Sequence, residues 1–430
     1  MLLAKKVSMR ILVLTINYWP ERTGIGAVLT RRCEYLASLG HEITVCTGMP
    51  YYPEWRIHPG YEGKLLLREE RNGVTILRSW MWVPKKVTSA NRVVFESTFL
   101  ASSLLRATNS RKPELMLVVS PPLGLGLSAV FLSRWWKIPY AFDVQDMQPD
   151  AAADLGMLPR AVLPVLYRLE AMAYRNASLI STVTEGMRQK IVAKGISGDK
   201  VAVVPPPADD TVFGVGDGVT GHEFRRKHGL EGKFVVAHSG NMGVKQGLGV
   251  MLDAALQLRE QRDFVFVLAG DGAMKSRLKE RAAALYLANI RFLPLQEHAE
   301  FLQMLAATDL ALIVQQSTVS DIVFPSKTVT LLSAARPVAA SVRANSEVGR
   351  VIRESGSGVV TEPENVEALA AAIKEFFDHP GKRLAMGQFG RQYALQHWDE
   401  TRVLSNFEGH MLKTCHAPAY DAITERSTSI

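Results

Sequence analysis

Short apolar runs alternate with segments of helical periodicity along most of the chain, and this alternation constrains the fold more than any other feature. The run Ile11–Ile16 predicts a buried strand, and apolar residues at helical spacing over 28–39, ending at Gly40, predict the following helix. Strands that alternate with helices form parallel sheets with helices on both faces. The sequence therefore predicts an α/β fold.

The pattern occurs twice. In the first half, further strands are predicted at 43–47, 74–77, 115–119, 140–142, 179–182 and 201–204, with helices near 92–107, 124–135, 160–175 and 185–194. Pro205–Pro207 and the glycine-rich stretch Gly214–Gly221 then interrupt it. In the second half, strands are predicted at 234–238, 264–269, 290–293, 310–314, 338–341 and 359–361, with helices near 246–261, 273–287, 298–307, 326–335 and 364–378. We therefore predict two doubly wound Rossmann-like domains, 9–205 and 206–395, and a segment 396–430 in which a helix returns toward the first domain before a polar tail.

Composition narrows the class of partner. The formal net charge of +8, from 50 basic and 42 acidic residues, favours anionic partners such as nucleotides or acidic lipid. No nucleic-acid-binding motif is found, so we expect no nucleic acid partner. The three cysteines form no CxxC or Cys/His cluster, which fits a reducing compartment and no metal. No run reaches the roughly 18 apolar residues of a membrane span. We expect a cytoplasmic protein that is peripheral, if membrane-bound, on the inner face of the plasma membrane.

Two loops in the first half follow predicted strands, where ligands of parallel sheets bind. The loop Asn17–Gly26 places Gly24 and Gly26 at a helix N-terminus, which can receive an anion; a plain turn is the alternative. Three carboxylates then follow the strand at 140–142, and such groups can act as bases or hold sugar hydroxyls. They are Asp143, Asp146 and Asp150. Helix capping is the alternative, and the pattern favours function most for Asp146.

Three loops in the second half have the character of a phosphate site. In Ser239–Gly247, glycines free the backbone and Lys245 stands before a helix, which suits a phosphate better than a solvated turn. The stretch Ala269–Gly272 is a glycine turn, which by itself is weak evidence for a phosphate site. Phe324–Lys327 opens a helix with a serine cap and a lysine, where an anion can dock or ordinary capping suffices. An inter-domain cleft is the expected active site.

Together these loops resemble the retaining glycosyltransferases of family 4, which have the GT-B fold of two Rossmann-like domains facing across a cleft. The matching motifs are Thr23–Gly26, Gln145–Asp146, Gly240 with Lys245, Gly270–Gly272 and Ser326–Lys327. Residues 14–21, 143–150, 240–247 and 325–327 are most similar to the colanic acid biosynthesis (WcaI-like) branch, and the resemblance extends over about residues 9–400.

Three positions depart from the family pattern. Many members have a catalytic histidine where this chain has Gln145, and many have arginine where it has Asn241. The family's pair of glutamates eight residues apart is replaced by Ile322 and Thr330. Since the second glutamate usually holds the donor ribose, the nucleotide base is left open.

The resemblance implies transfer of a sugar from a UDP- or GDP-sugar to a lipid-linked glycan in exopolysaccharide, capsule or O-antigen biosynthesis, with an undecaprenyl-linked acceptor, retention at the anomeric carbon and neither metal nor cofactor. It assigns catalysis to Asp146, Lys245 and Gln145. It assigns donor and phosphate binding to Gly24, Gly26, Gly240, Asn241, Gly247, Gly270, Asp271, Ser326 and Lys327. Acceptor-side candidates are Asn17, Tyr18, Asp143 and Asp150.

Basic and aromatic residues in 84–112 and 134–137 suit a membrane surface. The alternative is that Val94, Phe95 and Leu105 belong to the core while the charges are merely solvated. Two other functions stay open: a nucleotide-sugar 2-epimerase of the same architecture, and a catalytically inactive sugar-nucleotide-binding partner, which the departures at Gln145, Asn241 and Thr330 motivate. An NAD enzyme is disfavoured, because no GxGxxG follows a strand.

Overall fold

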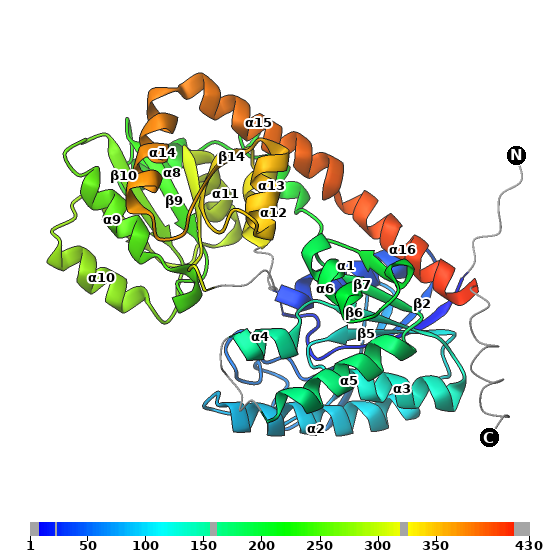
Figure 1. Ribbon diagram of the computed structural model, residues 1–430. Helices are drawn as coiled ribbons and strands as arrows, with labels where there is room; N and C mark the ends of the chain where they lie inside the picture. The colour runs from blue at the N-terminus through cyan, green and yellow to red at the C-terminus, as the bar shows by residue number, and fades with distance from the viewer. Residues whose placement is uncertain (1–7, 22–23, 155–160, 319–325, 417–430) are drawn as a thin grey trace, which may run out of the picture. The chain divides into compact units, whose positions relative to one another are not determined.

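The computed structural model describes residues 8–21, 24–154, 161–318 and 326–416. The chain divides into two compact units, Met1–Pro205 with Leu404–Ile430, and Pro206–Val403. Each unit is a parallel sheet with helices on both faces (Figure 1). Among the described residues, no helix has the length and apolar character needed to cross a bilayer.

The first unit is built on an eight-stranded sheet in the order β3-β4-β2-β1-β5-β6-β7-β8. The strands are β1 (Arg10–Leu14), β2 (Glu42–Gly48), β3 (Leu66–Arg71), β4 (Val74–Ser79), β5 (Leu115–Ser120), β6 (Tyr140–Val144), β7 (Leu179–Thr182) and β8 (Val201–Val203). Only β3 is antiparallel, in a hairpin with β4. The sequence did not predict β3, because this edge strand is charged and half-exposed rather than apolar.

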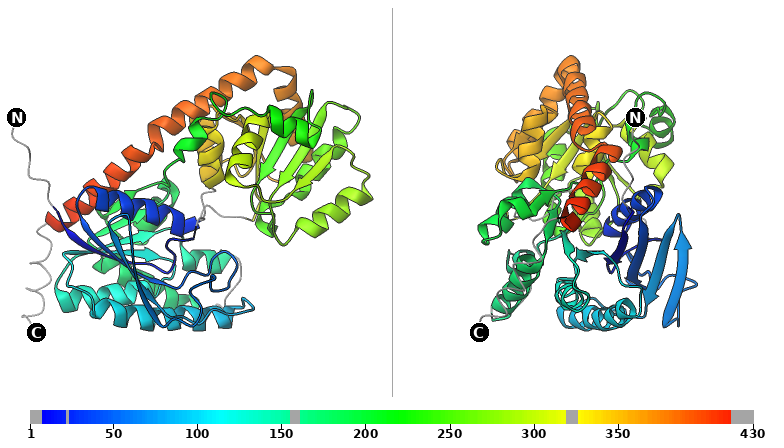
Figure 2. Two further views of the ribbon diagram at one scale, coloured as in Figure 1. Left: turned by 180° about the vertical axis from the view of Figure 1, so that it is seen from behind. Right: turned by 90° about the vertical axis from the view of Figure 1, so that its right-hand side faces the viewer.

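Helices cover both faces of this sheet. They are α1 (Gly24–Ser38), α2 (Ser89–Thr108), α3 (Leu125–Trp136), α4 (Gln148–Asp154), α5 (Leu163–Asn176), α6 (Glu185–Ala193) and α16 (Glu400–His416). The helices α2, α3 and α5 form a layer on one face, and α1 and α6 lie on the other (Figure 2). The strands between the layers are buried on both sides, which explains their continuous apolar runs.

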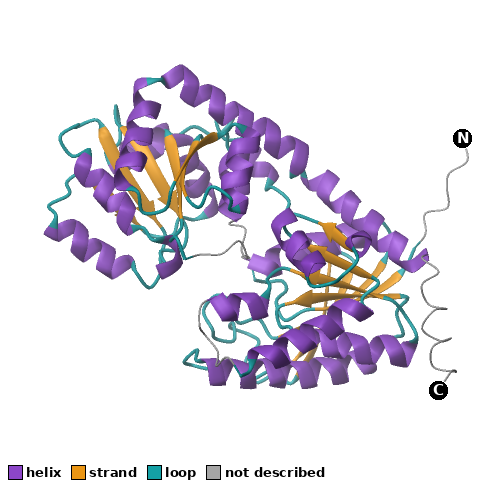
Figure 3. Cartoon of the chain, in the orientation of Figure 1, coloured by secondary structure: helices purple, strands orange, loops and turns teal. Residues whose placement is uncertain are grey.

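The second unit has a six-stranded, fully parallel sheet in the order β11-β10-β9-β12-β13-β14. Its strands are β9 (Phe234–Ser239), β10 (Phe264–Ala269), β11 (Ile290–Leu293), β12 (Leu310–Val314), β13 (Val338–Ser341) and β14 (Gly358–Thr361). Its helices are α7 (Asp210–Phe213), α8 (His222–His228), α9 (Gly249–Gln257), α10 (Lys275–Ala284), α11 (His298–Ala307), α12 (Ser326–Ser333), α13 (Glu347–Ser355), α14 (Val366–Asp378) and α15 (Pro380–His397). Helices cover both faces of this sheet (Figure 3), and apolar clusters fill the spaces between the helices and the strands.

The last described helix, α16, is tied to the first unit. The Phe407 ring lies 4.9 Å from the guanidinium carbon of Arg32, and Glu408 lies 3.4 Å from the imidazole of His41. The sequence predicted helix throughout 380–410, whereas the structure has two helices that Trp398 and Asp399 separate. The Asp399 side chain accepts a hydrogen bond from the backbone N–H of Arg402 and so starts the second helix.

Candidate active site

Each sheet has one place where the strand order reverses, and open parallel sheets bind ligands there. In the first unit this point lies between β1 and β5, and in the second between β9 and β12. The loops after β1 and β9 contain two of the predicted motifs. Strand β10 is the direct neighbour of β9, and β6 is separated from β1 by β5. The fold therefore places these motif loops at the ligand-binding ends of the two sheets.

In the second unit, the glycine loops after β9 and β10 are pressed together. A Cβ on Gly270 would stand 2.0 Å from the carbonyl oxygen of Gly240, so no other residue fits at position 270 without moving the loops. Both glycines also have positive φ, 116° and 139°. The loops are joined by hydrogen bonds from the N–H of Gly240 to Ala269 and from the N–H of Met242 to Asp271. The predicted tight turn at 269–272 thus shapes the predicted phosphate loop.

Lys245 lies on the short 3-10 helix Val244–Gln246, and its side chain is exposed beside the exposed Asn241. Its backbone carbonyl accepts a 2.9 Å hydrogen bond from the N–H of Gln316, in the loop after β12. Gly247 ends the turn with a φ of 59°, where a Cβ would lie 3.0 Å from the Gln316 side chain. The loop that presents Lys245 is therefore fixed from two sides while its ammonium group faces solvent.

Lys327 approaches the same loop from α12. Its ammonium nitrogen lies 3.5 Å from Nε2 of His238, near the carboxyl end of β9, and 3.7 Å from where a Cβ of Gly240 would be. Burial lowers the pKa of His238 to about 3, so the imidazole is neutral at pH 7 and can accept from the ammonium. Burial also lowers the pKa of Lys327 from 10.5 to about 8. No sequence pattern pointed to His238, because positions 238 and 327 come together through the fold.

Ser326 and Asp271 complete the predicted donor residues. Ser326 is exposed as the first residue of α12, and the preceding Phe324 and Pro325 of its motif lie outside the described residues. Asp271 is 80% exposed, accepts from the N–H of Gly272 and lies 3.8 Å from Lys275. These contacts give Asp271 a role in its own turn.

In the first unit, Glu21 organises the loop after β1. Its side chain is buried, accepts hydrogen bonds of 3.0 Å from the N–H groups of Tyr51 and Tyr52, and accepts one of 2.8 Å from the Asn17 amide. Burial raises the pKa of this carboxyl above its usual range. A Cβ on Gly26 would come within 3.1 Å of Glu21, which accounts for the predicted glycine. Sequence reasoning missed Glu21 although it closes the motif of residues 17–21.

The structure also places two more of the predicted site residues of this loop, Gly24 and Tyr18. Gly24 opens α1 with a φ of 62°. Tyr18 was an acceptor-side candidate, but its side chain is only 1% exposed. A ring buried this far belongs to the core of the first unit, so the acceptor role predicted for it does not fit the structure.

The loop after β6 separates the three predicted carboxylates. Asp143 is 1% exposed, and Arg32, equally buried, donates to it at 3.0 Å. Ser181 and Gln145 each donate a 2.6 Å hydrogen bond to the same carboxylate. These three buried or half-buried donors occupy both oxygens of the Asp143 carboxylate, so the structure gives this side chain a place in the fold rather than the predicted acceptor role, and it positions Gln145.

Asp150 also differs from the prediction. It lies on α4 and accepts from Lys194, which also donates to Glu170 at 2.6 Å. This cluster ties α4, α5 and the end of α6 together, so Asp150 has a structural partner. Asp146 is half-buried in the short loop between β6 and α4, next to Gln145. Because it lies in the loop that follows the strand, Asp146 stays the carboxylate predicted to contact a ligand.

Within the described ranges, no group of three or more His, Cys, Asp or Glu side chains is arranged to hold a metal ion. The second unit presents two lysines near its glycine loops, Lys245 and Lys327, and these suit a phosphorylated ligand. In the first unit, the loop after β6 carries the amide of Gln145 next to the carboxylate of Asp146, two groups that can orient a hydroxyl.

The fold and these loops define a class of protein. Residues 23–207 match the family described as glycosyl transferase 4-like domain, and residues 221–393 match glycosyl transferases group 1. The crystal structure of Anabaena Alr3699/HepE in complex with UDP superposes with a TM-score of 0.71 at 16% identity, covering 94% of this chain and 100% of that one. WaaG, a glycosyltransferase involved in lipopolysaccharide biosynthesis, gives 0.62 at 16% identity, covering 91% and 98%. The architecture is that of the GT-B glycosyltransferases.

The particular family follows from sequence. WcaI of Escherichia coli K12, named as a glycosyl transferase of colanic acid biosynthesis, is 31% identical over 407 residues, which are 93% of this chain and 98% of that protein. The chain belongs to this family of glycosyltransferases. The fold and enzyme class that the motifs implied are confirmed, and membership in a transferase family favours transfer over the epimerase alternative.

Proposed function

We propose that this glycosyltransferase moves a sugar from a UDP- or GDP-sugar to a hydroxyl of a lipid-linked saccharide, with retention, during synthesis of a surface polysaccharide. The observation that supports it most is the pair of lysines in the second unit, Lys245 exposed in the loop after β9 and Lys327 on α12 beside neutral His238. Solved structures of the similar HepE hold UDP and UDP-glucose, which favours a nucleotide-sugar donor.

The main chemical requirement of this reaction is to stabilise the leaving group. As the bond to the sugar breaks, the diphosphate gains negative charge, and cations fixed beforehand stabilise that charge by several kcal/mol, about 3–4 for one well-placed donor. Lys245, Lys327 and the N–H groups near Gly247 and Ser326 supply positive potential in the proposed site. As part of this proposal, we expect turnover to continue after divalent cations are removed with EDTA.

Asp146 and Gln145 act on the other reactant. Retention without an enzyme nucleophile requires the acceptor hydroxyl to attack from the face that the diphosphate leaves. Asp146 would orient the donor sugar or that hydroxyl, with no covalent adduct. Asp143 holds the amide nitrogen of Gln145, so the amide oxygen is the atom left for a ligand.

A donor panel tests the function. UDP- and GDP-sugars are incubated with a polyprenyl-linked acceptor, and nucleotide release and product are measured. We expect turnover with one donor, and a loss of about 10²-fold in Asp146→Asn, typical of a removed acid–base or orienting group. Asp199→Asn, an exposed carboxylate of the same unit, is the matched control.

The outcomes separate the alternatives. Normal turnover in Asp146→Asn removes this residue from the reaction. A protein that UDP or GDP stabilises in thermal denaturation, yet that turns over no donor, is the inactive binding partner rather than an enzyme.

Nucleotide affinity should depend on pH through Lys327. The free protein holds this ammonium with a pKa of about 8, and a bound diphosphate raises that pKa. Binding therefore takes up a proton above pH 8, and the affinity for UDP or GDP falls as pH rises, approaching tenfold per unit. Calorimetric titrations from pH 7 to 9.5 measure this slope. Lys327→Arg stays charged and should lose the slope; an unchanged slope in that variant means that another group titrates.

A further inference from the structure

The helices α3 and α5 expose large apolar side chains on the first unit. On α3, Leu127, Phe131 and Trp135 are 39%, 51% and 57% exposed. Their spacing of four residues puts all three on one side of the helix. Burying such side chains is favourable by about 1.5–3 kcal/mol each, so a stripe of three is costly to leave in water.

The adjacent helix α5 continues this surface with alternating chemistry. Val165 and Met172 are 53% and 39% exposed, and Arg168 and Arg175, which are also exposed, lie between and beyond them. Spacings of three and four residues place these four side chains on one face. The outer face of α5 is thus apolar and basic together.

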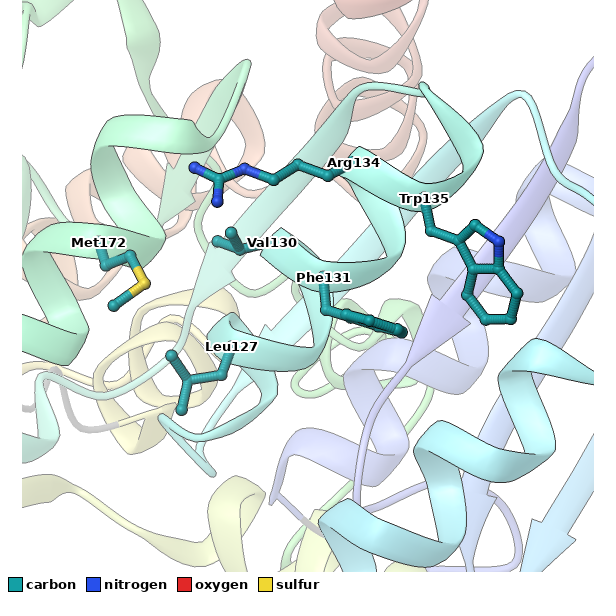
Figure 4. A pocket seen from close by; sticks show the side chains of 6 residues that line it. All are labelled: Leu127, Val130, Phe131, Arg134, Trp135 and Met172. Carbon is teal, nitrogen blue, oxygen red and sulfur yellow. The ribbon is translucent and has the colours of Figure 1, made fainter.

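A shallow groove of about 640 Å³ lies between the two helices (Figure 4). Met172 of α5 stands across it from Leu127 and Val130 of α3. The Arg134 guanidinium reaches from α3 to the Asn176 side chain of α5, with a hydrogen bond of 3.3 Å. This contact holds the two helices in register and leaves the groove open to solvent.

The charge of this face has one sign. Within Leu125–Trp136 and Leu163–Asn176 the sole carboxylate is Glu170, which is 2% exposed and paired with Lys194. The exposed charges of both helices are therefore arginines: Arg134, Arg168 and Arg175. Two copies meeting through this face would bring arginines together without a carboxylate to compensate, whereas anionic headgroups complement them.

We propose that the α3/α5 face, defined by Leu127, Phe131, Arg134, Trp135, Arg168, Met172 and Arg175, docks the protein on a bilayer that contains anionic lipid. Aromatic and aliphatic side chains enter the headgroup boundary while arginines bind lipid phosphate. The inference rests on the proposed function in one respect: a lipid-linked acceptor gives the enzyme a reason to be there.

This surface differs from the one predicted from sequence, which centred on 84–112. On α2, Phe95 and Phe99 are buried, as the alternative reading expected for Phe95, while Val94 and Leu105 are exposed. The helix also carries a half-buried ion pair, Arg92 with Glu96, so its surface is less uniformly basic. Of the predicted stretches, 134–137 lies on the α3/α5 face and α2 supplies a control.

Sedimentation of the full chain with vesicles tests the proposal. We expect binding to phosphatidylcholine vesicles with 30% phosphatidylglycerol at low salt, and weak binding to pure phosphatidylcholine or in 0.5 M salt. Arg168→Gln with Arg175→Gln should weaken binding roughly 30-fold, at about one factor of five per lost arginine. Phe131→Ser with Trp135→Ser should weaken it at least as much. Leu105→Ser on α2, and Tyr286→Ser with Leu295→Ser on the second unit, all highly exposed, should leave it unchanged.

Three results would overturn the proposal: no co-sedimentation of the wild type with anionic vesicles at low salt, normal binding by the Phe131/Trp135 variant, or a wild-type dimer that this variant converts to monomer in light scattering. Thermal stabilisation by UDP or GDP, measured on the same variants, shows that they are folded. The same measurement separates the two proposals. If neither UDP nor GDP stabilises the wild type, the proposed function is contradicted, whereas the result with vesicles is unaffected.

Discussion

Replacing Lys245 with alanine lowers turnover by about 10²- to 10³-fold, the loss typical of removing one preorganised donor from a developing anion. The loop should keep its shape, because its fixed contacts use the backbone: the carbonyl of Lys245 holds Gln316, and Gly247 packs on the same residue. The ammonium group is exposed, and toward the described residues its side chain makes no hydrogen bond or ion pair that the substitution would remove. Steady-state rates with the donor found in the panel measure the change.

The control for this variant is Lys279→Ala, which removes an exposed lysine from α10 in the same unit. It should change neither rate nor thermal midpoint. A wild-type rate in Lys245→Ala means that the phosphate assignment is wrong. Both variants must have the thermal midpoint of the wild type, so that a reduced rate cannot come from unfolding. Surface substitutions of this kind change the free energy of unfolding by no more than about 0.5 kcal/mol.

Much of the second unit could be predicted from sequence for a simple reason. Its central strands are buried on both faces, so β10 and β12 appear as uninterrupted apolar runs, and β10, β11, β12 and β13 all have the predicted bounds. The edge strand β3 escaped prediction because it is charged and half-exposed. The helix α13 was missed although its buried Val348, Val351 and Ile352 have helical spacing, because it is short and most of its other residues are charged or polar.

The residues of the candidate site likewise fall into those that a local sequence pattern reveals and those that it does not. Motifs within one loop, such as Gly240 and Lys245, could be found because their spacing is local. The pairing of Lys327 with His238 joins residues 89 positions apart, and Glu21 meets Tyr51 and Tyr52 at about 30, so no local pattern reveals them. Such contacts follow from the strand order alone.

The carboxylates after β6 show how a correct loop can be assigned wrong roles. Asp143 is still within the strand, where it faces α1 and accepts from Arg32. Asp150 lies one turn into α4 and turns to Lys194. Only Asp146 lies in the short connection between the two elements. The cluster of acidic residues in the sequence therefore indicated the correct loop. The positions at which β6 ends and α4 begins determine which of the three carboxylates lies in the loop itself.

Asp143→Ala should destabilise the first unit by about 3–5 kcal/mol, because it leaves the buried guanidinium of Arg32 without its counter-charge. Arg32 is fixed by Val204 at 3.2 Å and by the Phe407 ring, so it cannot swing to water without disturbing α16. Ser181 and Gln145 lose an acceptor as well. For a unit of this size the thermal midpoint falls by roughly 6–20 °C. Urea and thermal denaturation measure the loss.

A double-mutant cycle separates this charge effect from simple loss of packing. Arg32→Met combined with Asp143→Ala should recover part of the stability, since no buried charge is then left unpaired, and the coupling should exceed about 1 kcal/mol. Glu70→Ala, which breaks the exposed Arg68–Glu70 pair of the same unit, should cost under about 1 kcal/mol. If Asp143→Ala costs no more than Glu70→Ala, the buried pair does not hold this unit together. Gln145 would then owe its position to the backbone of β6 rather than to the carboxylate.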